Sequence, residues 1–361
     1  MSGAIAFLQF NRLVLWGDTA STEITSQALC AEVATPSPYC GFVAAQTLTG
    51  QPTATALALS ADGQTLVSGG QDKALKVWDL NTGKLKKTAQ SDSGQVITVA
   101  ISTDGKTVAS GSADRMVRVW RSDSAQPPQL LKGHTDQVKH VAITPDGKTL
   151  ISGSNEEVIL WDLAAGQRQA TVPDWSRSHF QVGPITVEPG PNRFSLLALN
   201  PVNKTAIWEF LGGDVVVWNL VKDEEIVALK ERFDSLAGYV LSAQVSPDGK
   251  AAALQYSNSS KKFETRLKVW DLTTGQVIAR GNTAFTRNLF LDVPIALSQD
   301  AIVGSVSGQL KVWGLQTGEP IAGIQAEKMS SLVISEDGKL LAGISGDPAS
   351  QDARIKVFRR P

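Results

Sequence analysis

The sequence is poor in the side chains from which most metal and redox centres are built. It has only two cysteines and three histidines in 361 residues. None of the histidines, His134, His140 and His179, stands at a metal-ligand spacing from another histidine or from a cysteine. The composition therefore predicts neither a metal site nor a bound cofactor.

The chain also has no excess of positive or negative charge. The 34 basic residues are balanced by 35 acidic ones, the formal net charge is −1, and no long run carries a single sign. Binding to nucleic acid through its phosphate backbone usually needs a basic stripe. The charge balance therefore argues against a nucleic-acid partner.

Long apolar runs are absent too. No segment has the ~20 consecutive apolar residues of a membrane-spanning helix. The apolar residues 4–10 are interrupted by Asn11-Arg12 and have no basic residues before them, so they make a poor signal peptide. These features predict a cytoplasmic protein, with export to the periplasm as the alternative.

Sequence motifs of common enzyme classes are missing as well. The chain has no Gly-x-Ser-x-Gly elbow and no Gly-Lys-Ser/Thr loop of the spacing that cradles phosphate. Its Asp-Gly pairs lie at turns, where the backbone favours these residues, and they lack the further spaced carboxylates of a calcium loop. The sequence leaves open a Ser-His-Asp catalytic set brought together by the fold. It nevertheless favours a protein that is not an enzyme.

What the chain does have is a short unit that recurs. In residues 55–86, four short runs of alternating apolar residues are separated by polar turns, most of which contain glycine. Such runs predict an antiparallel meander of four strands. The third run ends in an aromatic residue at a position that repeats along the chain. The equivalent residues are Trp78, Trp120, Trp161, Trp218, Trp270, Trp313 and Phe358.

A period of about 40–45 residues with four strands and a Trp-Asp ending is typical of a propeller blade. On these residues the chain resembles the WD40-repeat family over residues 42–361, and its closely matching regular repeats are similar to bacterial, especially cyanobacterial, members. The Trp-Asp pair stands at Trp78-Asp79, Trp161-Asp162 and Trp270-Asp271. The resemblance implies an all-β fold, a seven-bladed propeller, and a function in binding other proteins.

The resemblance also implies a hydrogen-bonded set inside each blade. In the family, the histidine of a Gly-His pair joins a serine, an aspartate and the tryptophan. Here the pair appears once, at Gly133-His134, and its expected partners are Ser152 and Trp161. The aspartate is missing, because the turn reads Asn155-Glu156-Glu157. We therefore expect an incomplete network in every blade and apolar packing as the main force that holds the blades together.

Strand counting predicts how the ring closes. The last repeat, residues 329–359, supplies only three strands, so residues 42–48 should add its outer strand and bring the two ends of the chain into one blade. Residues 1–41 should form a hairpin and a linker that cap the ring, and the alternative is an eighth blade around Trp16. The expected unit is one propeller domain over residues 42–361, monomeric by itself.

The long insertions gather on one side of the predicted disc. With strands a to d named from the axis outward, the a–b and c–d turns lie on one face, here called the tight-turn face. The b–c turns and the d-to-a connections lie on the other, the loop-rich face. All four long insertions, residues 172–194, 257–265, 282–292 and 345–353, belong to the loop-rich face. Because loops on a rigid scaffold carry specificity, this face is the predicted binding face, as the resemblance also implies.

The insertions carry aromatic residues beside charged ones, a combination enriched at interface hot spots. Arg177 lies between Trp175 and Phe180, and Arg287 follows Phe285 closely. The simpler interpretation is that each ring folds back to cover a blade edge. The candidate partner-binding residues are Trp175, Arg177, His179, Phe180, Lys261, Phe263 and Arg287.

Together these features predict a non-catalytic scaffold that presents its loop-rich face to a partner protein in the assembly or regulation of a complex. One alternative is an enzyme that uses the central channel, although the innermost strands are nearly all small or apolar. The other is an exported structural or surface protein in which Cys30 and Cys40 form a disulfide, instead of two free thiols in a reducing cytosol.

Overall fold

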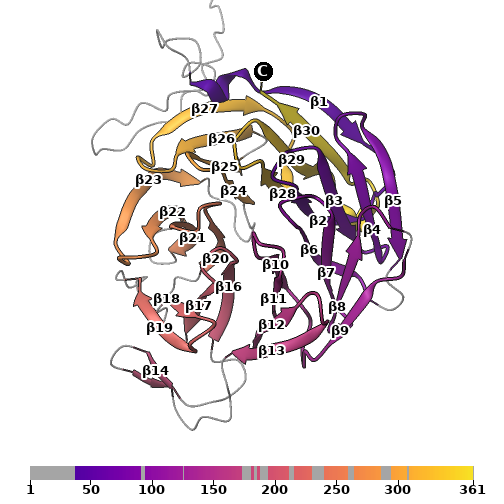
Figure 1. The fold of residues 1–361 in the computed structure, drawn as a ribbon. Coiled ribbons are helices and arrows are strands. Elements are labelled where there is room, and N and C mark those ends of the chain that lie inside the picture. The colour runs from indigo at the N-terminus through magenta and orange to yellow at the C-terminus, as the bar shows by residue number, and fades with distance from the viewer. Residues whose placement is uncertain are drawn as a thin grey trace, which may run out of the picture.

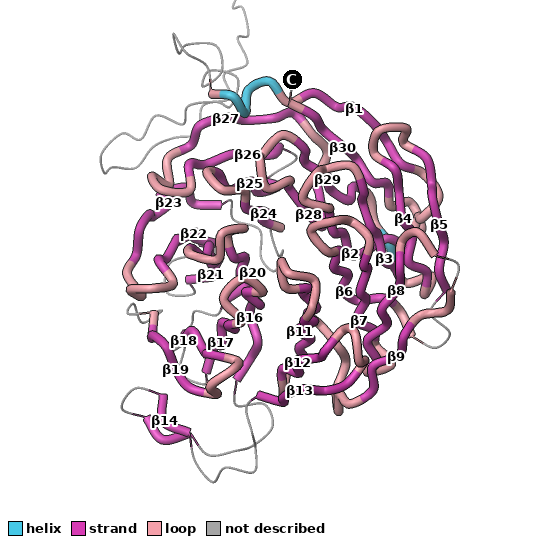
Figure 2. Tube along the Cα trace, in the orientation of Figure 1, coloured by secondary structure: helices cyan, strands magenta, loops and turns pink. Residues whose placement is uncertain are grey.

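Seven four-stranded antiparallel sheets stand around a common axis in the computed structural model (Figure 1). The structure describes residues 37–90, 94–124, 126–172, 180–182, 185–187, 194–210, 215–229, 240–258, 264–285, 294–306 and 309–360. Within these residues, helix occurs only as two short 3-10 turns, η1 (Pro38–Gly41) and η2 (Pro348–Ser350) (Figure 2). The predicted all-β, seven-bladed propeller is therefore confirmed.

In six blades, four strands that follow one another in sequence also pair in that order. Blade 1 has β2 (Ala54–Leu59), β3 (Thr65–Gly70), β4 (Ala74–Asp79) and β5 (Lys84–Gln90). Blade 2 has β6 (Val96–Ile101), β7 (Thr107–Ser112), β8 (Met116–Arg121) and β9 (Gln129–Lys132). Blade 3 has β10 (His140–Ile143), β11 (Thr149–Gly153), β12 (Val158–Asp162) and β13 (Gln167–Val172).

The next three blades follow the same order. Blade 4 has β16 (Phe194–Asn200), β17 (Thr205–Phe210), β18 (Val215–Asn219) and β19 (Glu224–Ala228). Blade 5 has β20 (Val240–Val245), β21 (Ala251–Asn258), β22 (Glu264–Asp271) and β23 (Val277–Phe285). Blade 6 has β24 (Ile295–Leu297), β25 (Ala301–Val306), β26 (Gln309–Gly314) and β27 (Pro320–Gln325).

The seventh blade joins the two ends of the chain. Its inner strands are β28 (Met329–Ile334), β29 (Leu340–Ser345) and β30 (Arg354–Arg359), and its outer strand is β1 (Val43–Leu48). The β1–β30 ladder runs from the pair Val43–Arg359 to the pair Leu48–Ile355. The predicted closure by an N-terminal strand is therefore confirmed, and the ladder leaves no gap between the last blade and the first.

A local turn motif keeps the a–b turns short. In blade 1, Ser60 Oγ donates to Asp62 Oδ1 at 2.6 Å and accepts from the Thr65 amide at 3.0 Å, while Gly63 takes φ +66°. The side chains satisfy the turn without extra residues, and glycine adopts the left-handed conformation at no steric cost. The same Ser/Thr–Asp bond recurs at Ser102, Thr144, Ser246 and Ser335.

The core lies between the blades. Trp78 of blade 1 packs in one cluster with Leu66 of its own blade and with Leu48 and Ile355 of blade 7. The six tryptophans that recur with the repeat are each at most 4 % exposed. Each blade thus covers a face of its neighbour with apolar side chains, which removes from water the surface that an isolated four-stranded sheet would expose.

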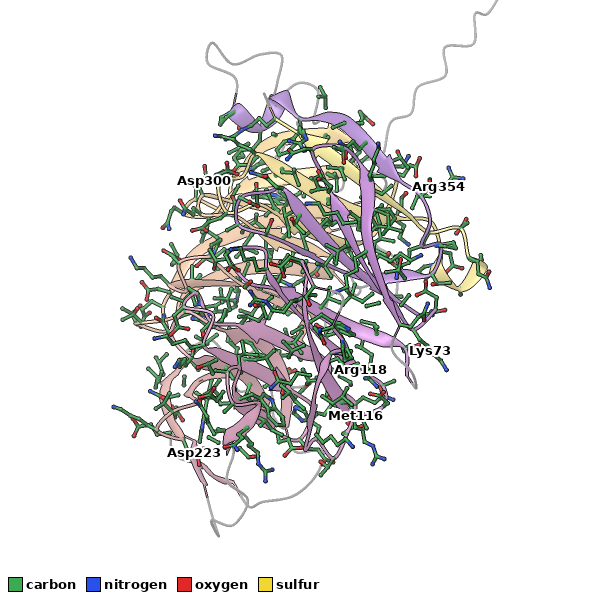
Figure 3. All side chains as sticks on the ribbon, turned by 45° about the vertical axis from the view of Figure 1, so that its right-hand side comes forward. Lys73, Met116, Arg118, Asp223, Asp300 and Arg354 are labelled. Atoms are coloured by element: carbon green, nitrogen blue, oxygen red, sulfur yellow. The ribbon has the colours of Figure 1, made fainter. Side chains whose placement is uncertain are left out.

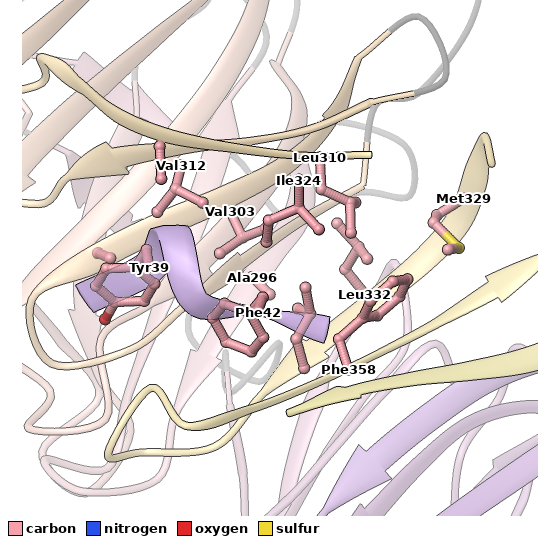
Figure 4. Packing of buried hydrophobic residues seen from close by; sticks show 13 residues of the cluster. Tyr39, Phe42, Ala296, Val303, Leu310, Val312, Ile324, Met329, Leu332 and Phe358 are labelled. Atoms are coloured by element: carbon pink, nitrogen blue, oxygen red, sulfur yellow. The ribbon is translucent and has the colours of Figure 1, made fainter. Parts of the chain in front are cut away.

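The segment before β1 is clamped to blade 6. Tyr39 in η1 is 1 % exposed; its hydroxyl donates to Asp300 and lies 3.0 Å from Ser298 Oγ. The Arg360 guanidinium stands 5.0 Å from the centre of the Tyr39 ring. Tyr39 and Phe42 belong to a buried hydrophobic cluster that also contains Val303 of blade 6 and Phe358 of blade 7 (Figure 4). Contacts with the ring thus begin a few residues before the predicted boundary at residue 42, while the predicted hairpin around Trp16 lies outside the described residues.

Replacing Tyr39 by phenylalanine should weaken this clamp. The Y39F change removes a hydrogen bond to a charged carboxylate, so the free energy of unfolding should fall by about 1–2 kcal/mol, and Y39A, which also leaves a cavity, should cost about 3–5 kcal/mol. Urea denaturation measures both. Val43→Ala is the control, because Val43 is 60 % exposed and should change stability by less than about 0.5 kcal/mol.

Alkaline pH provides a second readout of the same contact. Burial, with the hydrogen bond to Asp300, raises the pKa of Tyr39 from 10.0 to about 12. The unfolded chain therefore loses its proton first, and the stability that Tyr39 provides is lost as the pH rises from about 10 to about 12. The difference in stability between the wild type and Y39F should shrink over that range; a constant difference would contradict the assignment.

Cys40 lies at the same clamp and is disulfide-bonded. Cys30, the other cysteine of the chain, lies outside the described residues, so its pairing with Cys40 stays a prediction. If the pair forms, thiol labelling of the denatured chain should modify no site without reductant and two sites after reduction, as counted by mass spectrometry. Two labelled sites without reductant would instead support the pair of free thiols.

Candidate functional site

Most of the sequence-predicted partner-binding residues fall on segments that the structure does not describe. Trp175, Arg177, His179, Lys261, Phe263 and Arg287 lie outside the described residues. Phe180 begins β14 (Phe180–Val182), whose backbone pairs with β15 (Ile185–Val187). This small hairpin lies close to β19 at the outer edge of the ring (Figure 1).

Backbone hydrogen bonds define the tight-turn face. The residue that enters each c–d turn donates to a carbonyl of the a–b turn in the same blade. In blade 1, Leu80 N donates to Gln64 O at 2.8 Å, and in blade 2, Ser122 N donates to Lys106 O at 2.8 Å. Equivalent bonds occur in blades 3 to 6, and in blade 7, which has no c–d turn, Arg360 N after β30 donates to Lys339 O at 2.9 Å. This face is therefore a repeated set of short, mutually bonded turns.

A second set of backbone bonds defines the loop-rich face. Here the b–c turns bond to the connections that join neighbouring blades. Gln71 N donates to Thr53 O at 3.1 Å, and Ala353 N donates to Pro52 O at 3.0 Å. The second bond joins the insertion of blade 7, which contains η2, to the connection that leads into blade 1. The b–c turns of blades 1 and 7 therefore meet the connection between these blades on this face, whereas the other three insertions lie largely outside the described residues.

One connection on this face, residues 133–139, is held by a buried polar network. His134 Nε2 lies 2.6 Å from Ser152 Oγ, which also accepts from Trp161 Nε1 at 2.7 Å. Glu157 lies beside this network: its Oε1 is 3.4 Å from His134 Nδ1, without the geometry of a hydrogen bond, and accepts from the Thr135 amide at 3.0 Å. The aspartate is absent from blade 3, as expected, but the longer glutamate side chain reaches across the shortened turn to the same histidine.

The electrostatics of Glu157 fit this role. Burial raises its pKa, but the contacts with His134 and the Thr135 amide outweigh burial and hold the pKa below its usual value. The ionised form of Glu157 is therefore the one that the folded blade stabilises.

Blade 1 completes the same network with a different residue. Gln51 occupies the histidine position: Ser68 donates to its Oε1, and its Nε2 donates to Asp72 Oδ1 at 3.2 Å. Trp78 Nε1 donates to Ser68 Oγ at 2.8 Å. The expectation of an incomplete network is thus wrong for blade 1. The sequence did hold a signal, because Gly50-Gln51 precedes Trp78 by the same distance as Gly133-His134 precedes Trp161.

In blade 2, the aspartate of the b–c turn pairs with an arginine and not with a glutamine or histidine. Asp114 forms a bidentate pair with Arg118, with N–O distances of 2.7 and 3.2 Å, and Arg118 is only 4 % exposed. Figure 3 labels Arg118 near Met116 of the same strand. Within the described residues, Ser110, at the position of Ser68 and Ser152, has no hydrogen-bond partner for its buried hydroxyl.

A cavity of about 670 Å³ follows the axis of the ring and is lined by the innermost strands of blades 1 to 5 and 7. Most of its lining residues are apolar by type, for example Leu57, Val99 and Leu197, although polar atoms expose more of the cavity surface than apolar atoms do. Lys139, the last residue of the connection 133–139, and His140, the first residue of β10, also line it. The start of β10 therefore places a cation and an imidazole at the loop-rich end of the channel, although strand composition alone had suggested small and apolar side chains.

The imidazole of His140 is neutral at physiological pH. Burial, together with the nearby charge of Lys139, lowers the pKa of His140 to about 4, against the opposing effect of a hydrogen bond with the Leu196 backbone. Lys139 is the only charged residue that lines the cavity within the described part of the chain. The channel is therefore a largely neutral space with one positive charge.

Comparison with known proteins defines the class. Three segments match the family model of the WD domain, G-beta repeat: residues 43–79, 83–121 and 125–162. Each match spans the outer strand of one blade and three strands of the next, so the repeat is offset from the blade by one strand. With the seven-bladed ring, these matches place the chain in the WD40-repeat propeller family. No curated protein matches the chain.

The family assignment carries a general function. WD40 propellers commonly act as scaffolds for protein interactions and are generally not catalytic. In the described part of the chain, no three His, Cys, Asp or Glu side chains gather in a way that would hold a metal ion. None of the described helices is long and apolar enough to cross a membrane.

Removing the central hydroxyl of the blade 3 network should destabilise the fold. Ser152→Ala leaves the buried His134 and Trp161 nitrogens without their partner, so the free energy of unfolding should fall by about 2–4 kcal/mol. The matched control is Ser110→Ala in blade 2, which removes a hydroxyl without a partner and should stay within about 1 kcal/mol of the wild type. Equal losses for both variants, measured by urea denaturation, would show that the network contributes nothing.

Proposed function

We propose that this protein is a non-catalytic scaffold that binds a partner protein on its loop-rich face, in the assembly or regulation of a complex. The observation that carries the proposal is the difference between the two faces. The tight-turn face repeats one short hydrogen-bonded arrangement in all seven blades, whereas the four long insertions belong to the other face. Variation confined to one face of a rigid scaffold is typical of a recognition surface.

The rigidity of the ring supports this function. The β1–β30 ladder and the Tyr39 clamp fix the ends of the chain, and inter-blade clusters with buried tryptophans fix the blades. A surface that is already ordered loses little conformational freedom when a partner binds, so more of the contact energy appears as affinity.

The chemistry of the channel favours binding over catalysis. Acid–base catalysis usually needs groups whose pKa values are set for proton transfer near the working pH. In the described lining, His140 has a pKa of about 4, and no carboxylate or thiol accompanies it. A protein partner therefore suits the site better than a substrate.

We further propose that Trp175, Arg177 and Phe180 contribute to the contact, with His179, Lys261, Phe263 and Arg287 on the same face. The insertions at residues 172–194, 257–265 and 282–292 carry all of them. Aromatic and arginine side chains dominate the energetics of many protein interfaces. We also propose a cytoplasmic protein that is monomeric before it meets its partner.

The triple variant W175A/R177A/F180A tests the site. Affinity purification of the tagged protein from its native cell, with mass spectrometry, should recover a partner with the wild type and not with the variant. The melting temperature should change by less than about 2 °C, because loop substitutions away from the core have small effects on stability. Unchanged capture by this variant would count against the three residues.

The matched control is a triple variant on the opposite face. Lys106, Lys148 and Lys250 occupy equivalent positions in the a–b turns of blades 2, 3 and 5. Replacing all three by alanine should leave capture intact. Loss of capture in this variant alone would place the interface on the tight-turn face and overturn the proposed function.

A further inference from the structure

We propose that the loop-rich end of the central channel receives a carboxylate side chain, aspartate or glutamate, from the partner protein, and that Lys139 binds it. This inference rests on the proposed function, because it names what the partner inserts. It is carried by three features of the channel: its size, its single charge, and the way the fold holds that charge in place.

The channel has the dimensions of a binding pocket. Its volume of about 670 Å³ lies within the roughly 300–1,000 Å³ of typical ligand sites. Strands from blades far apart in the sequence form its wall, including Leu57 of blade 1 and Val333 of blade 7. These apolar side chains suit the methylene groups of an inserted side chain. A single long side chain from a protein surface therefore fits the space.

The only charge in the described lining is positive. Lys139 is exposed and directly precedes β10, and among the described carboxylates none forms an ion pair with it. By contrast, Lys356, on the third strand of blade 7, lies 3.6 Å from Glu327. An incoming carboxylate would therefore meet an ammonium group without having to displace a described partner.

The backbone around Lys139 is firmly placed. Its own amide donates to Gly153 O at 2.9 Å, and the preceding Val138 amide donates to Ser112 O at 3.2 Å. The same connection begins at His134, which the Ser152 network holds. The blade network thus fixes the backbone from which the lysine side chain extends. Such preorganisation lowers the entropy lost on binding.

The remaining polar groups of the pocket are neutral. His140 is uncharged near pH 7, and Ser195, Ser242, Gln244 and Ser331 also line the cavity. One cation with neutral hydrogen-bond donors matches one carboxylate. A doubly charged phosphate is usually met by several basic groups or an arginine fork, and a lysine or arginine side chain would be repelled. The pocket therefore selects a singly charged acid.

Peptide titration of the full chain tests this directly. The probe is tetraglutamate with blocked termini, and the matched peptides are tetraglutamine and tetralysine. Tetraglutamate should shift the His140 ring signals in NMR spectra saturably, whereas the other two should not. In Lys139→Gln the affinity should fall about tenfold or more, because a charge-assisted contact is lost, and Lys139→Arg should retain most of it.

The control for general surface charge is Lys132→Gln, because Lys132 is exposed on the outer strand β9. This variant should bind tetraglutamate like the wild type. Three results would each contradict a carboxylate site at Lys139. They are binding of tetraglutamate by Lys139→Gln with wild-type affinity, binding of tetraglutamine by the wild type as tight as that of tetraglutamate, and His140 signals that do not move at saturation.

Partner capture separates this inference from the proposed function. If the wild type captures a partner and Lys139→Gln captures it equally well, the pocket is overturned while the binding face stands. If the wild type captures no partner, the proposed function fails. The peptide titration alone then decides whether the pocket binds a carboxylate.

Discussion

The ladder between β1 and β30 is the interaction on which the rest of the structure depends. A four-stranded blade has two apolar faces and cannot bury both by itself, so each blade needs a neighbour on either side. Pairing of Val43–Leu48 with the last strand places blade 7 against blade 1, and the cluster that contains Trp78 crosses that junction. The ring is thereby closed, and all seven blades share the same kind of apolar contact.

Within that ring, buried polar networks define local geometry on the loop-rich face. Blades 1 and 3 build equivalent networks from different residues, with Gln51 in the place of His134 and Glu157 in the place of Asp72. What is retained is a donor or acceptor within reach of the central serine. Because a buried polar group without a partner is costly, the requirement falls on geometry and hydrogen-bonding capacity more than on residue identity.

The two faces of the disc follow from different rules. The Ser/Thr–Asp–Gly turns are complete within a few residues, so they are short and alike. Connections on the other face have to span between strands or blades, and their length is limited only weakly by loop-closure entropy. The loop-rich face is therefore where sequence changes accumulate at little cost to the fold, and it is also where Lys139 enters the channel.

Alternation, turn chemistry and strand counting are local or periodic properties, so the strands, the tight turns, the buried tryptophans, the number of blades and the closing strand could all be predicted from the sequence. The folded ring was needed to reveal that Gln51 completes the network of blade 1 and that Glu157 approaches the histidine of blade 3, since side chains from three separate segments meet there. It alone also showed that Lys139 and His140 face a shared channel. That channel is formed by strands of six blades, and the spatial relation between those strands is set by packing around the ring, which no spacing along the chain records.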